Sequence, residues 1–153
     1  MLVRPAELRD VEALKALRHA AFSKHAPSAY SPEEVENLLN SLDEEELVAM
    51  ITQRQMFVGE VDGVLVGCAG WRGASLRHVY VRPGRERAGV GTRLVAWAES
   101  DYRDRTSAAE MHLGCGAYAR PFYEALGYRL VSRDRDRDGS ELLRMTKSRD
   151  RGA

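Results

Sequence analysis

The stretch Leu76-Arg-His-Val-Tyr-Val-Arg-Pro83, Gly84-Arg-Glu-Arg-Ala-Gly-Val-Gly91, Thr92-Arg-Leu-Val-Ala-Trp97 decides the fold. Its first block is rich in β-forming residues and predicts a strand that ends at Pro83, because proline cannot donate to a sheet ladder. The block that follows the loop has apolar residues at helical spacing: Val90, Leu94, Trp97 and Ala98. Gly89 and Gly91 lie where this helix begins, and the first amides of a helix can donate to phosphate oxygens. We therefore expect a strand, a glycine-containing loop and a helix, with an anion site at the loop.

Two common nucleotide-binding motifs match this loop poorly. A Walker loop needs Lys-Ser or Lys-Thr after its second glycine, whereas Gly84 and Gly89 are followed by Val90-Gly91. A dinucleotide fingerprint needs a third glycine, and that position holds Leu94. An unrelated nucleotide-binding domain is therefore the less favoured interpretation.

A second motif, Ala119-Arg-Pro-Phe-Tyr-Glu-Ala-Leu-Gly-Tyr128, follows about thirty residues later. Gly127 lies where a helix C-cap belongs. The apolar residues before it again have helical spacing: Ala119, Phe122, Tyr123 and Leu126. By itself this periodicity predicts only a short amphipathic helix.

Together and in this order, the two motifs resemble those of the GNAT-type N-acetyltransferases, whose glycine loop binds acetyl-CoA. The resemblance extends loosely over nearly the whole chain. It implies an α/β (α+β) fold with a central, mixed but mostly antiparallel sheet, helices on both faces, and fourth and fifth strands that splay apart. We expect one domain over residues 1–147 and a charged, flexible tail over residues 148–153.

The resemblance also implies roles for particular residues. The backbone of Val79 and Val81 would pair with the pantetheine arm like an added strand, and the amides of residues 87–92 would bind the pyrophosphate. Tyr123 would protonate the departing thiolate, unless it only packs with its hydroxyl bonded to backbone. The expected cofactor contacts are Val79, Val81, Arg87, Ala88, Gly89, Val90, Gly91, Thr92 and Ala119.

His78 is the titratable imidazole of the first motif. Strand alternation predicts that it shares a face with Leu76 and Tyr80, opposite Val79 and Val81. It is a candidate base or water relay, the alternative being a half-buried, hydrogen-bonded histidine.

Two positions depart from the family pattern. Glu86 stands where arginine or glutamine is usual, and Gly116 stands where asparagine is common. If the Glu86 carboxylate faced the phosphates, its neutralisation would tighten CoA binding.

Composition limits the partners. The 23 basic residues equal the 23 acidic ones, which gives no electrostatic reason to expect nucleic acid or an anionic membrane as a partner. The first ten residues have neither the apolar core of a signal peptide nor a membrane span. Cys68 and Cys115 are too few for a disulfide framework or a zinc site, so we expect no metal and a cytoplasmic location.

Local patterns predict the remaining elements. Asp10 is the expected N-cap of a helix that runs to Phe22, with a connector over residues 23–30. Ser31-Pro-Glu-Glu34 is a capping box, and two short helices or one bent helix should follow up to residue 53. Asp62-Gly63 should turn a hairpin over residues 56–71. The other expected parts are strands over residues 1–4, 108–113, 128–132 and 142–147, and an exposed hairpin tip over residues 133–139.

The expected reaction is direct attack of a primary amine on the thioester of acetyl-CoA, used as a co-substrate. The expected partners are a small-molecule or peptide amine acceptor and a second copy of the chain in a homodimer. The alternative function is a non-catalytic acyl-CoA-binding or regulatory module on the same fold.

Overall fold

A computed structural model describes residues 1–137 and 139–148 of the chain and contains one mixed sheet. Its strand order is β1-β2-β3-β4-β5-β7-β6. Only the β4–β5 pair is parallel among the described strands. The strands are β1 (Leu2–Pro5), β2 (Met56–Val61), β3 (Val64–Arg72), β4 (Ser75–Val81), β5 (Glu110–Cys115), β6 (Arg129–Arg135) and β7 (Glu141–Ser148).

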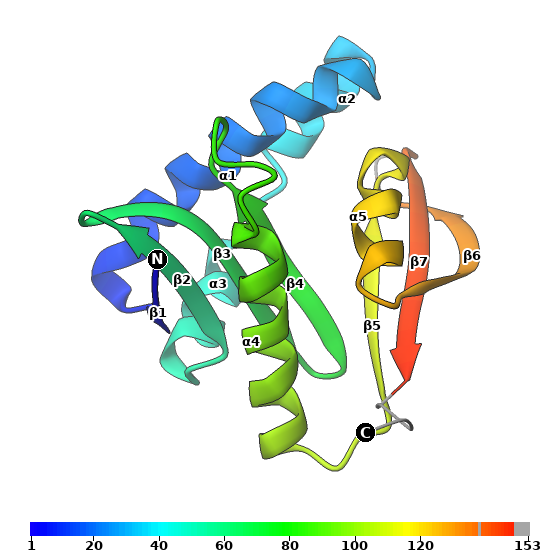
Figure 1. Cartoon of the computed structure of the whole chain (residues 1–153). Helices are drawn as coiled ribbons and strands as arrows, with labels where there is room; N and C mark the ends of the chain where they lie inside the picture. The colour runs from blue at the N-terminus through cyan, green and yellow to red at the C-terminus, as the bar shows by residue number, and fades with distance from the viewer. Residues whose placement is uncertain (138, 149–153) are drawn as a thin grey trace.

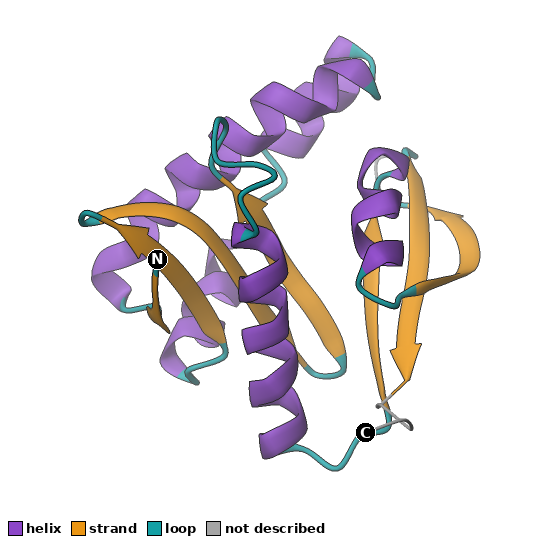
Figure 2. Ribbon diagram, in the orientation of Figure 1, coloured by secondary structure: helices purple, strands orange, loops and turns teal. Residues whose placement is uncertain are grey.

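Helices cover both faces of this sheet (Figures 1 and 2). Residues of α4 and α5 join one buried apolar cluster against the sheet, and residues of α1 and α3 join a second cluster on the opposite face. The bounds are α1 (Val11–His25), α2 (Pro32–Leu39), α3 (Glu44–Thr52), α4 (Val90–Arg105) and α5 (Arg120–Ala125), with 3-10 turns η1 (Leu8–Asp10), η2 (Ala26–Ser28) and η3 (Ala117–Ala119). The predicted mixed sheet with helices on both faces is confirmed.

Strands β4 and β5 meet only near the start of β4. Ser75 is in register with His112, and the His112 amide donates to the Ala74 carbonyl at 2.8 Å. Beyond this point the two strands diverge toward Val81 and Cys115, as Figure 1 shows. The predicted splay is confirmed, and it leaves one backbone edge of β4 without a strand partner among the described residues.

The hairpin of β2 and β3 turns as predicted. Asp62 and Gly63 both have positive φ, 51° and 76°, which is the geometry of a tight turn that matches the twist of the strands. Further along β3, a Cβ built on Gly67 would lie 2.7 Å from Val90 Cγ1, so glycine lets α4 approach the sheet closely.

The capping prediction is confirmed for α2 but not for α1. Ser31 Oγ accepts from the Glu34 amide while Glu34 accepts from the Ser31 amide, and Asp43 caps a separate α3. The Asp10 carboxylate does not cap α1. It lies at the end of η1, accepts from the Glu7 amide, and binds the Arg4 guanidinium at 2.7 and 2.9 Å.

Several predicted boundaries differ from the structure. Trp97 is 47% exposed, so it does not belong to the buried face of α4. The helix α4 itself continues to Arg105. Strand β6 extends to Arg135, so the first three residues of the predicted hairpin tip are paired with β7. Ser148, the first residue of the predicted tail, is the last residue of β7. Residue 138 of the predicted hairpin tip and residues 149–153 of the predicted tail lie outside the described residues. No described helix is long and apolar enough to cross a membrane.

Candidate active site

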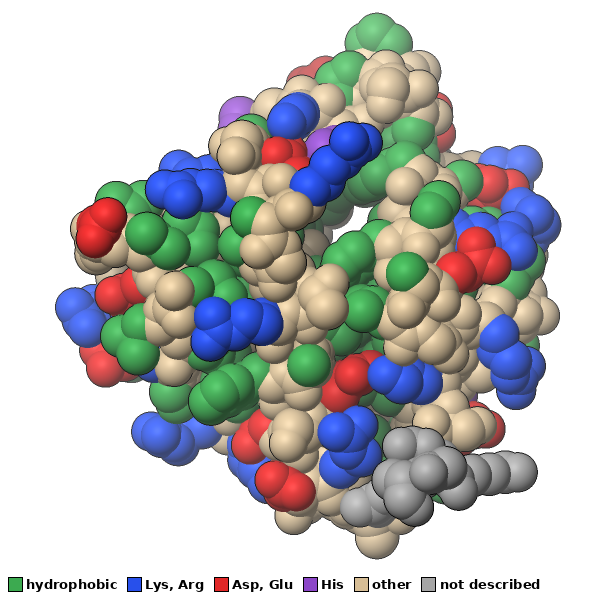
Figure 3. Space-filling model, viewed as in Figure 1, with side chains coloured by type: hydrophobic (Ala, Val, Ile, Leu, Met, Phe, Trp, Pro, Cys, Tyr) green, Lys and Arg blue, Asp and Glu red, His purple; other side chains and the backbone are tan. Residues whose placement is uncertain are grey.

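A cleft of about 1230 Å³ occupies the split between β4 and β5. Figure 3 shows the molecule hollowed at this place, with Lys and Arg side chains along its upper rim. Both faces of the sheet contribute to its walls. Lining residues include Arg18, Phe22 and Leu38 on the α1–α2 side, His78, Val79 and Val81 on β4, Gly89 and Gly91 at the start of α4, and Cys115, Ala119 and Tyr123 on the second half of the sheet.

The start of α4 presents unpaired backbone amides to this cleft. Gly89 is the N-cap, with φ at 78°, a conformation that favours glycine. Among the described residues, no acceptor is bonded to the amides of Gly89, Val90, Gly91 and Thr92, the four that a helix start leaves free. A Cβ on Gly91 would lie 3.1 Å from Phe122 Cζ and 3.2 Å from Val81 Cγ2, so the site has no room for a side chain there.

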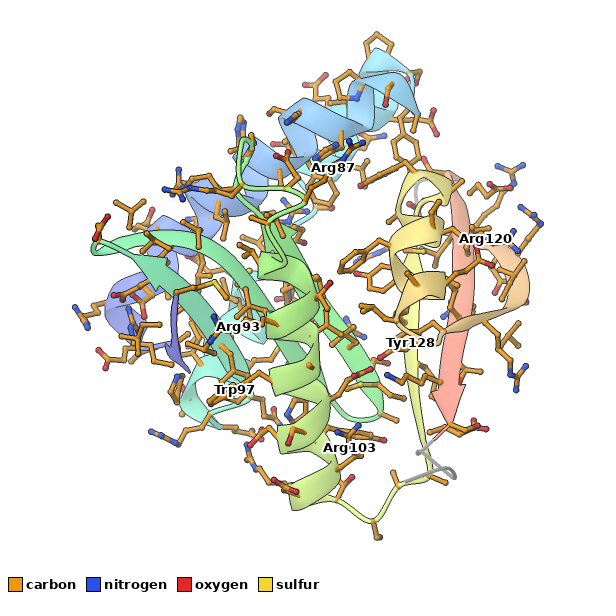
Figure 4. The ribbon with its side chains drawn as sticks, viewed as in Figure 1. Arg87, Arg93, Trp97, Arg103, Arg120 and Tyr128 are labelled. Carbon is orange, nitrogen blue, oxygen red and sulfur yellow. The ribbon has the colours of Figure 1, made fainter. Side chains whose placement is uncertain are left out.

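The structure brings together the predicted cofactor contacts with one exception. Val79 and Val81 lie on the open edge of β4, and Ala119 ends η3 on the opposite wall. Ala88 is exposed and its side chain does not line the cleft. Arg87 has positive φ, and Figure 4 places it at the edge of the gap between the two halves of the sheet.

Tyr123 projects from α5 into an aromatic wall. Its side chain is buried, with ring centroids 5.0 Å from Phe122 and 5.9 Å from Tyr128. Its hydroxyl forms no hydrogen bond with any residue in the described part of the chain, so the alternative of a backbone-bonded hydroxyl is not observed. Burial raises the pKa of this phenol well above its ordinary value, which keeps it protonated at neutral pH.

His78 occupies an irregular point of β4. Its φ is 55°, and the register with β3 shifts between Cys68 and Gly70, which is a bulge. The bulge breaks the expected alternation: Leu76 joins the apolar cluster on the α4 side with Val79 and Val81, whereas Tyr80 packs toward α1 and α3. The prediction that Leu76 shares a face with Tyr80 is therefore wrong.

The imidazole of His78 is 13% exposed and lines the cleft. Its Nε2 lies 3.4 Å from Glu46 Oε1 but is buried without a hydrogen bond to a described residue. Burial lowers the His78 pKa, and the neighbouring Glu46 carboxylate partly opposes this effect. The ring is therefore neutral near pH 7.

The model of the acetyltransferase (GNAT) domain matches residues 26–149. The chain belongs to this family.

Known GNAT structures share the fold over almost the whole chain. The GCN5-related N-acetyltransferase described as "Aminotransferase, Class-II" from Rhodopseudomonas palustris superposes with a TM-score of 0.86 at 25% identity, over 96% of this chain and 94% of that one. The PaiA N-acetyltransferase from Thermoplasma acidophilum, solved in complex with coenzyme A, gives 0.76 at 20% identity over 96% and 98%. A curated relative, blasticidin-S acetyltransferase from Streptomyces morookaense, is 33% identical over 75 residues, which span 48% of this chain and 55% of that protein.

Glu86, the unusual residue of this GNAT loop, is held by its neighbours. Its Oε1 accepts from Lys24 Nζ at 2.7 Å and lies 3.4 Å from His25 Nε2, while Oε2 accepts from the Gly84 amide at 2.7 Å. The hydrogen bond from Lys24 is the main reason that the pKa of Glu86 falls to about 2. The carboxylate therefore connects the loop to the end of α1.

Two groups of site residues could not be found from local sequence patterns. Glu46 lies in the first turn of α3 yet reaches His78 on β4, and Lys24 on α1 reaches Glu86. An aromatic contact also joins the two halves of the sheet, because the Tyr30 and Tyr118 rings lie edge to face at 6.1 Å. Each of these contacts depends on tertiary packing.

Among the described residues, no group of His, Cys, Asp and Glu side chains could hold a metal ion.

Proposed function

We propose that this GNAT protein transfers the acetyl group of acetyl-CoA to a primary amine. One observation carries the proposal: the unpaired amides of residues 89–92, the open edge of β4 and the Tyr123 side chain border the same cleft. These three features supply an anion site, a strip of backbone and a proton donor within one cavity.

The cofactor would lie along the β4 side of the cleft. The pyrophosphate would bind at the start of α4, where free amides and the helix dipole both favour negative charge. The pantetheine arm would follow the backbone of Val79 and Val81 and pass Ala119, toward Tyr123. The coenzyme A bound to the Thermoplasma acidophilum relative supports this choice of ligand.

The chemistry requires a neutral amine. A free alkylamine has a pKa of about 10.4 and is mostly charged at pH 7, so a base or desolvation must remove its proton. His78 would accept that proton, directly or through water, as the amine nitrogen forms a bond to the thioester carbonyl carbon. The C–S bond then breaks, the thiolate takes the Tyr123 proton, and the products are an amide and CoA.

A small-molecule acceptor is the first class to examine, because the curated relative is named for acetylating blasticidin-S, a small molecule. A panel should therefore contain nucleoside and aminoglycoside antibiotics, amino acids, polyamines and peptides with free amino groups. Release of CoA thiol reports turnover, and calorimetry reports CoA affinity. Turnover of one panel member supports the transferase, whereas tight CoA binding with no turnover across the panel would favour the non-catalytic module.

The cofactor site has its own test. Gly91→Glu should weaken CoA binding at least about 100-fold, because a side chain would fill the crowded helix start and bring a negative charge to the phosphates. Ala96→Glu adds the same charge to an exposed position of α4 and should bind CoA normally. Unchanged affinity in a folded Gly91→Glu protein would contradict the proposed cofactor site.

A further inference from the structure

His78 and Glu46 form an acid–imidazole pair at the edge of the cleft. Glu46 comes from the first turn of α3 and His78 from the bulge of β4, and their Oε1 and Nε2 atoms lie 3.4 Å apart. Both side chains are mostly buried, at 16% and 13% exposed. We propose that Glu46 is the positioning residue that holds His78 as the proton acceptor for the substrate amine, an inference that rests on the proposed acyl transfer.

The backbone at His78 supports a specific role for this residue. Positive φ in a non-glycine residue is uncommon and strained. Here it accompanies the bulge in β4, which places Leu76 on the face of Val79 and Val81, while the His78 imidazole lies on the opposite face beside Glu46. The strained residue therefore lies at the irregular point of the strand and in the wall of the cleft.

Glu46 is itself fixed from two directions. Arg77 Nη1 donates to its two carboxylate oxygens at 3.0 and 3.2 Å. The Glu46 amide donates to Asp43 Oδ1 at 3.0 Å, which anchors the first turn of α3. A carboxylate at a helix N-terminus is also stabilised by the helix dipole. These contacts hold the Glu46 carboxylate in a fixed orientation beside His78.

The charged groups around His78 come from three elements. Arg18 on α1 and Arg77 on β4 lower its pKa, together with burial, and Glu46 on α3 raises it. The other neighbours are neutral at pH 7: Cys68 on β3 donates to the His78 carbonyl at 3.1 Å, and the Tyr80 ring lies 6.2 Å away. Burial raises the pKa of both Cys68 and Tyr80 to about 12. Glu46 is thus the group that favours protonation of the ring.

The pair supplies a defined path for the amine proton. With the hydrogen on Nε2, the side of the ring 3.4 Å from the Glu46 carboxylate, Nδ1 would keep a free lone pair. Nδ1 takes the amine proton, the ring becomes an imidazolium, and the carboxylate stabilises that cation without being protonated. The proton then returns to solvent after the amide has formed.

The test compares Glu46→Gln with Glu45→Gln, its exposed neighbour in the same helix. Loss of the Glu46 charge makes the imidazolium less stable, so the acidic limb of kcat/KM should move to lower pH by about one pH unit. The plateau of kcat should fall about 10-fold or more, because the base is weaker and less well oriented. Glu45→Gln should leave both unchanged.

An NMR titration of the His78 imidazole, assigned with His78→Gln, needs no turnover and separates this inference from the proposed reaction. In Glu46→Gln the midpoint of this titration should move to lower pH by about one pH unit, the same shift as in the acidic limb of kcat/KM. A lower rate with an unmoved limb and unmoved midpoint would mean that Glu46 is only structural, and an unchanged rate would also overturn the proposal. If no acceptor is found but the midpoint moves, the Glu46–His78 coupling stands and the proposed reaction fails.

Discussion

Tyr123 and Glu86, on the two sides of the cleft, differ in the hydrogen bonds that their polar groups form with the protein. The Tyr123 hydroxyl is surrounded by aromatic rings and has no hydrogen-bond partner among the described residues. The Glu86 carboxylate instead lies beside an ammonium, an imidazole and a backbone amide. The Tyr123 hydroxyl can therefore form a hydrogen bond with a ligand, whereas the Glu86 carboxylate is already hydrogen-bonded within the protein.

We expect Tyr123→Phe to lower kcat by about 100-fold or more with little change in CoA affinity. The substitution keeps the ring and its packing but removes the proton that the thiolate needs. Initial rates with a verified acceptor, together with calorimetry of CoA binding, measure both quantities.

Tyr128→Phe is the matched control for this experiment. The Tyr128 hydroxyl donates to Glu99 Oε2 at 2.7 Å, and Tyr128 is not among the described residues that line the cleft. Its loss should lower the free energy of unfolding by about 1–3 kcal/mol, because a buried acceptor loses a donor, and kcat should change little. A decrease in kcat of less than about threefold for Tyr123→Phe would rule out the assigned proton transfer.

Glu86→Gln should weaken CoA binding by roughly 3- to 10-fold, the equivalent of about 1 kcal/mol. The charge that holds the loop to Lys24 would be lost, and the loop carries the phosphate-binding amides. Because the pKa of Glu86 is about 2, the carboxylate is ionised throughout the usual assay range and the difference should not vary from pH 6 to pH 8. Lys24→Met removes the same pair from α1 and should act in the same direction, whereas tighter binding by Glu86→Gln would show that its charge repels the phosphates.

At the scale of the elements, α4 joins the two halves of the splayed sheet. Glu99 is a buried carboxylate on this helix, and Lys147 Nζ on β7 donates to both of its oxygens at 3.1 Å. Tyr128, just before β6, donates to the same carboxylate. Since β4 and β5 pair at only one end, this polar contact helps to set the position of the second half relative to the helix.

Lys147→Met should therefore lower the free energy of unfolding by about 2 kcal/mol. A fully buried pair typically loses ~3–5 kcal/mol when one partner is removed, and the ammonium here is still 29% exposed. The double variant Lys147→Met/Glu99→Gln should recover part of the lost free energy of unfolding, because the buried Glu99 charge without its cationic partner is then removed. Lys15→Met breaks an exposed pair with Glu44 and should change the free energy of unfolding far less. Urea unfolding of all three variants measures these differences.

The elements that could be predicted from the sequence are those fixed by neighbouring residues. The strand, loop and helix around Gly89, the capping box at Ser31 and the turn at Asp62 depend on contacts a few positions apart. The errors arise where strand pairing or a contact outside the local motif decides. Asp10 binds Arg4 instead of capping α1, and the bulge at His78 reverses the side-chain alternation that a regular strand would have.

Across the whole molecule, contacts close the cleft at both ends of the split. The start of β4 pairs with β5 at one end. At the other end, Ser140 Oγ donates to Glu34 Oε2 at 2.6 Å, which ties the β6–β7 hairpin to α2. The walls between these contacts come from helices on both faces of the sheet, so the cavity extends from the α4 side to the α1–α2 side.

A cavity that extends to both sides of the sheet predicts how the initial rate depends on the concentrations of the two substrates. The acyl donor would approach from the α4 side and the amine from the α1–α2 side, so neither has to leave before the other arrives. Both would then be present together in a ternary complex, and double-reciprocal plots at several fixed concentrations of the second substrate should intersect instead of running parallel. Free CoA should compete with acetyl-CoA for the enzyme but not with the amine.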